Sequence, residues 1–337
     1  MRVLVTGGTG FIGRSLVRGA LGRGWEVVVL ARRPEALAAR SLAALGARLV
    51  MGDLTDRGSS RAAFEVAAPD LVFHLAGWYE LGIARKDRRR MWALNVEATE
   101  LALNLAAEVG AAKVVFTSST TALGDTGGET VDESFVRCSP PLSYYEATKS
   151  EAHRHALRHQ QAGEPVVIAC PAQVIGPGDH SVFGHLARLY MRRRLPPLTW
   201  APEGAFTFAH VEDVAEGLLL AGEKGKPGEL YFLAGMVLTI RQMLDVWRQG
   251  AGLRTPFIWL PRWLALAQAA LLTPARRALR LPEFMSPEAV RSSFVSFRYS
   301  SQKAVRELGA RFRTAEQAWE DTLKVEREGI GGRLSSE

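Results

Sequence analysis

Short apolar runs alternate with helical patterns through the first half of this chain, and this alternation strongly limits how the chain can fold. Six runs of six to eight residues have the composition of strands buried on both faces, and they occupy residues 2–7, 26–32, 47–54, 70–77, 112–119 and 165–172. Helical spacing of apolar residues fills the intervals. Strands of this kind, separated by helices, form a parallel sheet that helices cover on both faces. We therefore predict an α/β fold with a doubly wound parallel sheet, whose ligands bind at the carboxyl ends of the strands.

The pattern loosens after residue 172. Proline and glycine become frequent in 173–205, whereas 206–235 returns to a strand–helix–strand pattern and 236–337 is mainly helical. We predict that residues 1–172 form the core of this fold, with 206–235 returning to it. A smaller, mostly helical lobe, made of 173–205 and 236–337, would bind the substrate.

The composition narrows the class of protein. Of 337 residues, 47% are hydrophobic and 23% are charged, which is the balance of a soluble globular protein. No window reaches the ~18 apolar residues of a membrane span. The apolar run after Met1 is too short for a signal peptide, so we expect a cytoplasmic protein without a membrane span. The two cysteines, Cys138 and Cys170, give neither a disulfide framework nor a metal-binding spacing.

The net charge of +7 and the pI near 9.7 would suit an anionic partner. The arginines are dispersed, however, and no docking motif for nucleic acid accompanies them. We interpret them as solvated helix faces and expect no nucleic-acid partner. His155 and His159 are four residues apart on a predicted helix, but no third ligand is evident. We therefore expect surface histidines and no metal site.

A glycine-rich turn, "TGGTGFIG" (6–13), joins the first predicted strand to the first helix. In that position Gly7 would permit the tight turn, Gly10 would let the backbone approach a pyrophosphate, and Gly13 would let the helix pack closely on the sheet. The free N–H groups at the helix N-terminus would then face the phosphates. The turn predicts a dinucleotide cofactor, and it identifies the core of residues 1–172, with 206–235 returning to it, as a Rossmann-type dinucleotide-binding core.

The choice between NADP(H) and NAD(H) depends on the end of the second strand. Enzymes that prefer NAD usually place Asp or Glu there to bind the ribose 2′-hydroxyl. This chain has Arg32 and Arg33, and a guanidinium can bind a 2′-phosphate through two N–H groups. NADP(H) is therefore favoured, while NAD(H) stays open because both arginines could instead face solvent. Asp53, after the third strand, either accepts a hydrogen bond from the adenine amino group or caps the next turn.

The segment "SYYEATKSEA" (143–152) contains the candidate catalytic pair. Residues four apart share one face of a helix, which pairs Tyr145 with Lys149, whereas Tyr144 is turned about 140° away from Lys149. A phenol has a pKa near 10, and a nearby ammonium group favours the phenolate. The pair is therefore a candidate for proton exchange with a substrate, although a Y-x-x-x-K spacing is also common by chance.

Taken in order, these motifs resemble those of the extended short-chain dehydrogenases/reductases, the NAD-dependent epimerase/dehydratase superfamily. The segments that carry the resemblance lie within residues 1–235: "TGGTGFIG" (6–13), "GDL" (52–54), "HLAG" (74–77), "LNVEAT" (94–99), "VFTSST" (115–120), "YYEATK" (144–149), "CPAQVIGPGD" (170–179) and "FAHVEDVAEG" (208–217). The chain looks most like the dihydroflavonol-4-reductase-like and 3β-hydroxysteroid-dehydrogenase-like subgroup. One departure is Cys170, where the family often has Arg before the proline, and it weakens a sugar-nucleotide interpretation.

The resemblance implies a catalytic set of Ser119, Tyr145, Lys149 and Asn95. Ser119 would hydrogen-bond the substrate oxygen and Lys149 the nicotinamide ribose, while Asn95 would serve in a proton relay or, as we favour, in the structure. By family position, further residues would contact the cofactor: Thr6, Phe11, Ile12, Leu54, Leu75, Ala76, Gly77, Thr117, Pro171 and Val174. A homodimer formed through the helices at about 89–109 and 143–161 is a further family expectation. Asp213 begins a helical run, and we interpret it as a helix cap or a loop anchor.

The residues and the resemblance together predict an NADP(H)-dependent oxidoreductase that reduces a carbonyl, or oxidises a secondary alcohol, by hydride transfer at a Ser-Tyr-Lys site. Trp78 and Tyr79 would contact the small-molecule substrate. Aromatic residues of the C-terminal half would complete a pocket for an apolar ketone: Trp200, Phe206, Trp259, Trp263 and Phe284. Two alternatives stay open, an NAD-dependent nucleotide-sugar epimerase or dehydratase and a non-catalytic NADP-binding protein.

Overall fold

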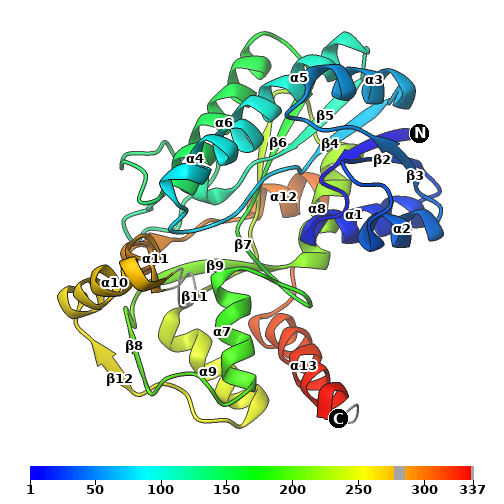
Figure 1. The fold of residues 1–337 in the computed structure, drawn as a ribbon. Helices are drawn as coiled ribbons and strands as arrows, with labels where there is room; N and C mark the ends of the chain where they lie inside the picture. Colours follow the sequence, from blue (N-terminus) through cyan, green and yellow to red (C-terminus); the bar gives the residue numbers. More distant parts are fainter. Residues whose placement is uncertain (277–284, 335–337) are drawn as a thin grey trace.

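Seven parallel strands form the central sheet, in the order β10-β6-β5-β4-β1-β2-β3 (Figure 1). The computed structural model describes residues 1–276 and 285–334. The strands are β1 (Arg2–Thr6), β2 (Glu26–Ala31), β3 (Arg48–Met51), β4 (Leu71–His74), β5 (Lys113–Thr117), β6 (Val166–Pro171) and β10 (Leu230–Leu233). The six apolar runs of the first half all lie in this sheet, and the strand order reverses between β1 and β4. The doubly wound α/β fold is therefore confirmed, and ligands of this fold generally bind at the carboxyl ends of the strands.

Helices cover both faces of the sheet, as strands that are apolar throughout require. Side chains of α3, α5 and α6 share one buried cluster with the sheet, and those of α1, α2, α8 and α12 share the cluster on the opposite face. These helices are α1 (Phe11–Gly22), α2 (Leu37–Ala44), α3 (Arg57–Ala67), α5 (Ala98–Glu108), α6 (Tyr144–Gln161), α8 (Val211–Lys224) and α12 (Gln302–Leu308). Before α5, the chain forms α4 (Arg85–Trp92) and a π-helical turn, η1 (Ala93–Glu97).

The rest of the chain forms a smaller lobe below the sheet in the view of Figure 1. Its strands are β7 (Gln173–Ile175), β9 (Ala205–His210), β11 (Met236–Thr239) and β13 (Ser296–Phe297) in one sheet, and β8 (Leu198–Trp200) with β12 (Ile258–Leu260) in another. Its helices are α7 (Val182–Met191), α9 (Ile240–Ala251), α10 (Arg262–Arg276), α11 (Pro287–Ser293) and α13 (Ala315–Leu334). The segment 206–235 divides between the two parts: β9 lies in the second sheet, whereas α8 packs on α1 and β10 ends the central sheet.

One buried cluster runs from the central sheet into the lobe. Leu4 and Phe116 belong to it in the sheet, and Trp247 and Trp319 belong to it in the lobe. The ring of Trp319 meets those of Trp247 and Phe208 edge-on, with centroids 5.0 and 5.6 Å apart. The two parts of the molecule therefore share a core.

Candidate functional site

The turn between β1 and α1 has a geometry that its glycines permit. Gly7 has a left-handed φ of 71°, and a Cβ atom there would lie 2.7 Å from the backbone nitrogen of Ala76. A Cβ atom on Gly13 would overlap the carbonyl oxygen of Gly7, so only glycine lets α1 approach the turn this closely. No side chain in the described part of the chain caps α1 at Gly10. The first N–H groups of α1 are therefore available to an anionic group.

Two exposed arginines follow β2, and an aspartate follows β3. Neither Arg32 nor Arg33 has an ion-pair partner among the residues that the structure describes. The Oδ1 atom of Asp53 accepts hydrogen bonds from the backbone N–H and the hydroxyl of Thr55, at 2.9 and 2.8 Å. The turn-capping role of Asp53 is thus confirmed, and its contact with adenine stays a prediction.

A buried histidine joins the carboxyl ends of β1 and β4. His74 Nδ1 lies 2.8 Å from the hydroxyl of Thr6, and His74 Nε2 lies 3.1 Å from the hydroxyl of Thr99. Burial lowers the pKa of His74 to about 3, so the ring is neutral, with one donor and one acceptor nitrogen. The Thr6 hydroxyl also accepts a hydrogen bond from the Ala76 N–H at 3.3 Å. The side chain of Thr6 is therefore engaged within the protein, where it fixes the β4 end against the glycine turn.

The adjacent residues Tyr144 and Tyr145 have different surroundings. Helix α6 begins at Tyr144 because the Ser143 hydroxyl caps it, accepting a hydrogen bond from the Glu146 N–H at 3.0 Å. Burial raises the pKa of Tyr145, while a hydrogen bond with Ser119 acts in the opposite direction. The ring of Tyr144 instead lies under the guanidinium of Arg88, at 4.9 Å. The structure thus brings Ser119 to Tyr145, the tyrosine that helical spacing favours.

Lys149 lies one turn farther along α6 and points toward β5. Its Nζ donates a hydrogen bond to the carbonyl oxygen of Thr117 at 3.1 Å and lies 5.5 Å from the ring centroid of Phe116. Burial lowers the pKa of Lys149 to about 8. The Thr117 hydroxyl is also buried, and it has no hydrogen-bond partner in the described part of the chain. Such a group beside Lys149 is one that a bound polar ligand would satisfy.

Asn95 lies in the π-helical turn η1 and holds the loop after β4. Its Oδ1 accepts a hydrogen bond from the Trp78 N–H at 2.7 Å, and its Nδ2 donates to the Trp78 carbonyl and to the Thr148 hydroxyl, both at 2.9 Å. The amide is thus engaged on both sides, which supports the structural role. A part in a proton relay stays a prediction. The ring of Trp78 lies under the guanidinium of Arg90, at 5.5 Å.

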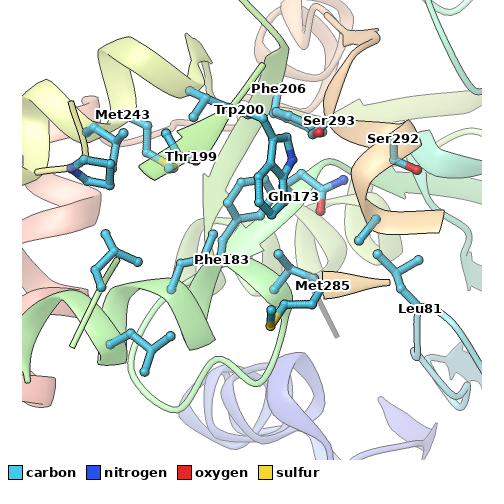
Figure 2. Close-up of a pocket in the computed structure, with 18 of the residues that line it drawn as sticks. Leu81, Gln173, Phe183, Thr199, Trp200, Phe206, Met243, Met285, Ser292 and Ser293 are labelled. Atoms are coloured by element: carbon cyan, nitrogen blue, oxygen red, sulfur yellow. The ribbon is translucent and has the colours of Figure 1, made fainter. Parts of the chain in front are cut away.

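A cavity of about 330 Å³ lies beside Tyr145, against the lobe. Figure 2 shows part of its lining. Tyr79 and Tyr145 both line it, and their rings meet edge-on with centroids 4.9 Å apart. Most of the wall is apolar and comes from the lobe: Phe183, Leu186, Leu198, Trp200, Phe206, Met243, Leu244, Trp247 and Met285. Gln173, Thr199, Ser292 and Ser293 add polar atoms (Figure 2). A cavity of this size, with mainly apolar walls and a few polar groups, suits an apolar small molecule.

The sequence predicted part of this wall. Tyr79, Trp200 and Phe206 line the cavity, but Trp78 does not, since its ring packs against α4. Trp259 packs under Arg241 at 4.8 Å, Trp263 is 70% exposed, and Phe284 lies outside the described residues. Sequence reasoning missed Gln173, Phe183, Met243 and Met285. They come from separate elements, so no local motif could have shown that they meet.

The other sequence expectations have mixed outcomes. His159 is buried and hydrogen-bonded to Glu164 at 2.6 Å, so its expected surface position is wrong, because α5 and the turn after α6 cover it. His155 contacts Glu100 and Glu151. Within residues 1–276 and 285–334, no cluster of side chains has the arrangement of a metal site, and no helix is long and apolar enough to span a membrane.

Asp213 anchors a loop, which is one of the two roles expected for it. Its carboxylate accepts a hydrogen bond from the backbone N–H of Arg313 at 2.8 Å and forms an ion pair with the same residue at 3.0 Å. The cap of α8 is the side chain of His210.

The remaining family positions differ in exposure. Gly77 is exposed, Leu54 and Pro171 are buried, and the other five are half-buried: Phe11, Ile12, Leu75, Ala76 and Val174. Their contacts with a cofactor stay a prediction.

Comparison with known proteins bears on this site. The model of the NAD dependent epimerase/dehydratase family matches residues 3–234. A putative dihydroflavonol 4-reductase from Synechocystis sp. is 32% identical over 334 residues, which cover 95% of this chain and 92% of that protein. A 4-hydroxy-2-methyl-3-oxo-4-farnesyl-3,4-dihydroquinoline-1-oxide ketoreductase from Stigmatella aurantiaca is 31% identical, over 96% of each chain.

Two further matches extend the comparison. A 3β-hydroxysteroid dehydrogenase/Δ5→4-isomerase from Mycobacterium tuberculosis is 30% identical over 69% of this chain and 64% of that protein. The solved structure of UDP-glucose 4-epimerase from Thermus thermophilus, a complex with NAD, has a TM-score of 0.75 and 24% identity, covering 97% of this chain and 99% of that one. That likeness shows a common fold.

Proposed function

The chain belongs to the NAD dependent epimerase/dehydratase family and is an NAD(P)-dependent enzyme of the extended short-chain dehydrogenase/reductase type, and on this basis we propose that it is an NADPH-dependent reductase of an apolar carbonyl compound. The reverse reaction, oxidation of the matching secondary alcohol, uses the same groups. One observation carries the proposal: Tyr145, hydrogen-bonded to Ser119 and one helical turn from Lys149, lines a largely apolar cavity.

Three side chains have separate roles in the proposed carbonyl reduction. Tyr145 donates its phenolic proton to the carbonyl oxygen of the substrate. Ser119 donates a hydrogen bond to the same oxygen and so polarises the carbonyl. The ammonium group of Lys149 stabilises the phenolate that remains on Tyr145. The reduced nicotinamide, when bound, supplies the hydride.

The residues beside this site fit a dinucleotide. The close turn at Gly7 and Gly13 leaves the N-terminus of α1 open to a pyrophosphate. The orphaned Thr117 hydroxyl, beside Lys149, fits the polar ribose of the nicotinamide half. Arg32 and Arg33, both exposed, favour a 2′-phosphate over a ribose hydroxyl, and hence NADP(H) over NAD(H).

The cavity wall favours an apolar substrate over a sugar nucleotide. A sugar nucleotide has many hydroxyl groups and a diphosphate, and Arg194 is the one cation among the described wall residues. Two similar proteins are named as reductases, one of a dihydroflavonol and one of a farnesyl dihydroquinoline oxide. Aromatic, steroid-like and isoprenoid ketones are therefore the first substrates to screen.

The test of the reaction compares two neighbouring tyrosines. Reduction of such a ketone is followed by loss of nicotinamide absorbance at saturating NADPH. Tyr145→Phe should lower kcat about 10²- to 10⁴-fold, because the proton donor is lost. Tyr144→Phe is the matched control and should keep its rate, since that ring packs under Arg88. Equal losses in the two variants would contradict the assignment.

The test of the cofactor is a pair of titrations followed by nicotinamide fluorescence. NADPH should bind at least about tenfold more tightly than NADH. Arg32→Glu should abolish the difference, because it replaces a guanidinium that binds the 2′-phosphate by a carboxylate that repels it. NADH binding as tight as that of NADPH, or NAD that co-purifies, would overturn the NADP(H) preference. Substrate screening would then turn to nucleotide sugars.

A further inference from the structure

Helix α10 has an apolar face turned toward solvent. At 100° per residue, one arc of this helix holds five exposed apolar residues: Trp263, Leu264, Ala267, Ala270 and Leu271. Trp263 is 70% exposed and Leu271 is 81% exposed. An amphipathic helix on a protein surface ordinarily turns polar residues outward, so this arrangement is the reverse of the usual one.

The opposite side of α10 holds the helix on the lobe. Ala265 and Ala269 are fully or almost fully buried and pack against Val290 of α11. Gln268 lines the cavity beside the candidate catalytic residues. The helix is thus already anchored through its inner side, while Trp263 and Leu271 on its outer face stay mostly exposed.

The chain just before α10, which includes β12, also has exposed apolar residues. Phe257 is 72% exposed and Ile258 is 45% exposed. We call these two residues, with Trp263, Leu264 and Leu271, the α10 patch. In Figure 1, β12 and α10 lie together at the margin of the lobe, away from the central sheet. A cluster of large exposed apolar side chains at one margin marks an interaction surface.

Exposed arginines lie close to the α10 patch. Arg254 and Arg262, on either side of Phe257, are exposed. Exposed Arg192 and Arg193 precede the segment whose Pro197 carbonyl accepts hydrogen bonds from the N–H groups of Phe257 and Ile258 at 3.0 Å.

We propose that the α10 patch docks this protein on the surface of a bilayer that contains anionic lipids. Apolar side chains with a tryptophan among them enter the boundary between headgroups and acyl chains, and the surrounding arginines attract anionic headgroups. A second copy of the chain fits this surface less well, because it would bring the same arginines together. Docking goes beyond the proposed function and does not depend on it, but it would place the cavity next to the phase in which apolar ketones dissolve.

The test is sedimentation of the whole protein with vesicles. Phosphatidylcholine vesicles, with and without about 30% phosphatidylglycerol, serve as the two probes, at low and at physiological salt. We expect the anionic vesicles to bind the protein about tenfold more tightly than the neutral ones, with weaker binding at higher salt. The assay needs neither substrate nor cofactor, so its outcome is separate from that of the catalytic tests.

Paired variants make the result specific. Trp263→Asp with Leu271→Asp should reduce binding to anionic vesicles about tenfold or more, since each change removes exposed apolar area and adds a repelling charge. The control carries Leu37→Asp with Val66→Asp, two comparably exposed positions at 84% and 57% on α2 and α3, and should bind like the parent. Circular dichroism checks that both fold.

Two outcomes would overturn the proposal. One is failure of the parent protein to sediment with anionic vesicles. The other is equal binding by the parent and the Trp263/Leu271 variant. If the parent fails to bind vesicles and light scattering shows an oligomer that only the Trp263/Leu271 variant loses, then the patch joins two copies of the chain instead.

Discussion

The ammonium group of Lys149 lies where its charge costs folding stability. Its pKa falls from 10.5 to about 8 because the side chain is buried, which means that the folded protein holds the proton less tightly than the unfolded chain does. The proposed chemistry needs this charge close to the phenol of Tyr145. Proteins commonly keep such costly groups at active sites, at the expense of stability.

This cost predicts a more stable but inactive variant. At pH 7, Lys149→Met should raise the free energy of unfolding by on the order of 1–2 kcal/mol, after allowance for the lost hydrogen bond to Thr117. The variant should therefore unfold at a higher urea concentration than the parent. The pKa of Lys149 in the folded protein, about 8, lies below the reference value of 10.5. The stability cost of the charge is therefore complete below pH 8, shrinks between pH 8 and pH 10.5, and is absent above pH 10.5. Urea unfolding at pH 7 and pH 10 measures the change. A variant less stable than the parent at pH 7 would refute this account of Lys149.

At the scale of the element, two glycines of α1 predict opposite effects. A Cβ atom on Gly13 would overlap the Gly7 carbonyl, so Gly13→Ala should push α1 off the turn, destabilise the protein by about 1–3 kcal/mol and weaken NADPH binding. Gly22, at the exposed end of the same helix, has open space at the Cβ position. Gly22→Ala should therefore stabilise the protein by up to about 1 kcal/mol and leave NADPH binding unchanged. Thermal unfolding and NADPH titration of both variants test the pair, and a common effect on both would contradict it.

The sequence predicts some features of this protein and not others for a physical reason. The glycine turn and the Tyr145–Lys149 spacing are encoded within a few residues, so periodicity and backbone sterics were enough to predict them. The central sheet was predictable for a similar reason, since its strands are apolar on both faces. The burial of His159 depends on α5, which lies far away in the sequence. The cavity wall likewise joins Phe183, Met243 and Met285 from three parts of the chain, and only tertiary packing brings them together.

At the scale of the whole molecule, the two parts depend on each other for their cores. β10 completes the central sheet beside β6, and α8 covers the face of α1, although both come after the first lobe segment in the sequence. The buried cluster that contains Leu4 in the sheet also contains Trp319 of the C-terminal helix. Because the chain crosses between the two parts in this way, unfolding of either part would expose buried side chains of the other.

We therefore expect the chain to unfold in one transition and to respond to a change in the lobe as a unit. Trp319→Ala removes a fully buried indole that packs against Trp247 and Phe208, and it should destabilise the whole protein by about 3–5 kcal/mol. Far-UV circular dichroism, which reports mainly on the larger core, and tryptophan fluorescence should then shift together to lower urea concentration. Trp263→Ala, at a position 70% exposed, is the matched control and should change stability by less than about 0.5 kcal/mol. Two separate transitions in the Trp319 variant would mean that the lobe unfolds on its own, because the shared cluster would then not couple the two parts.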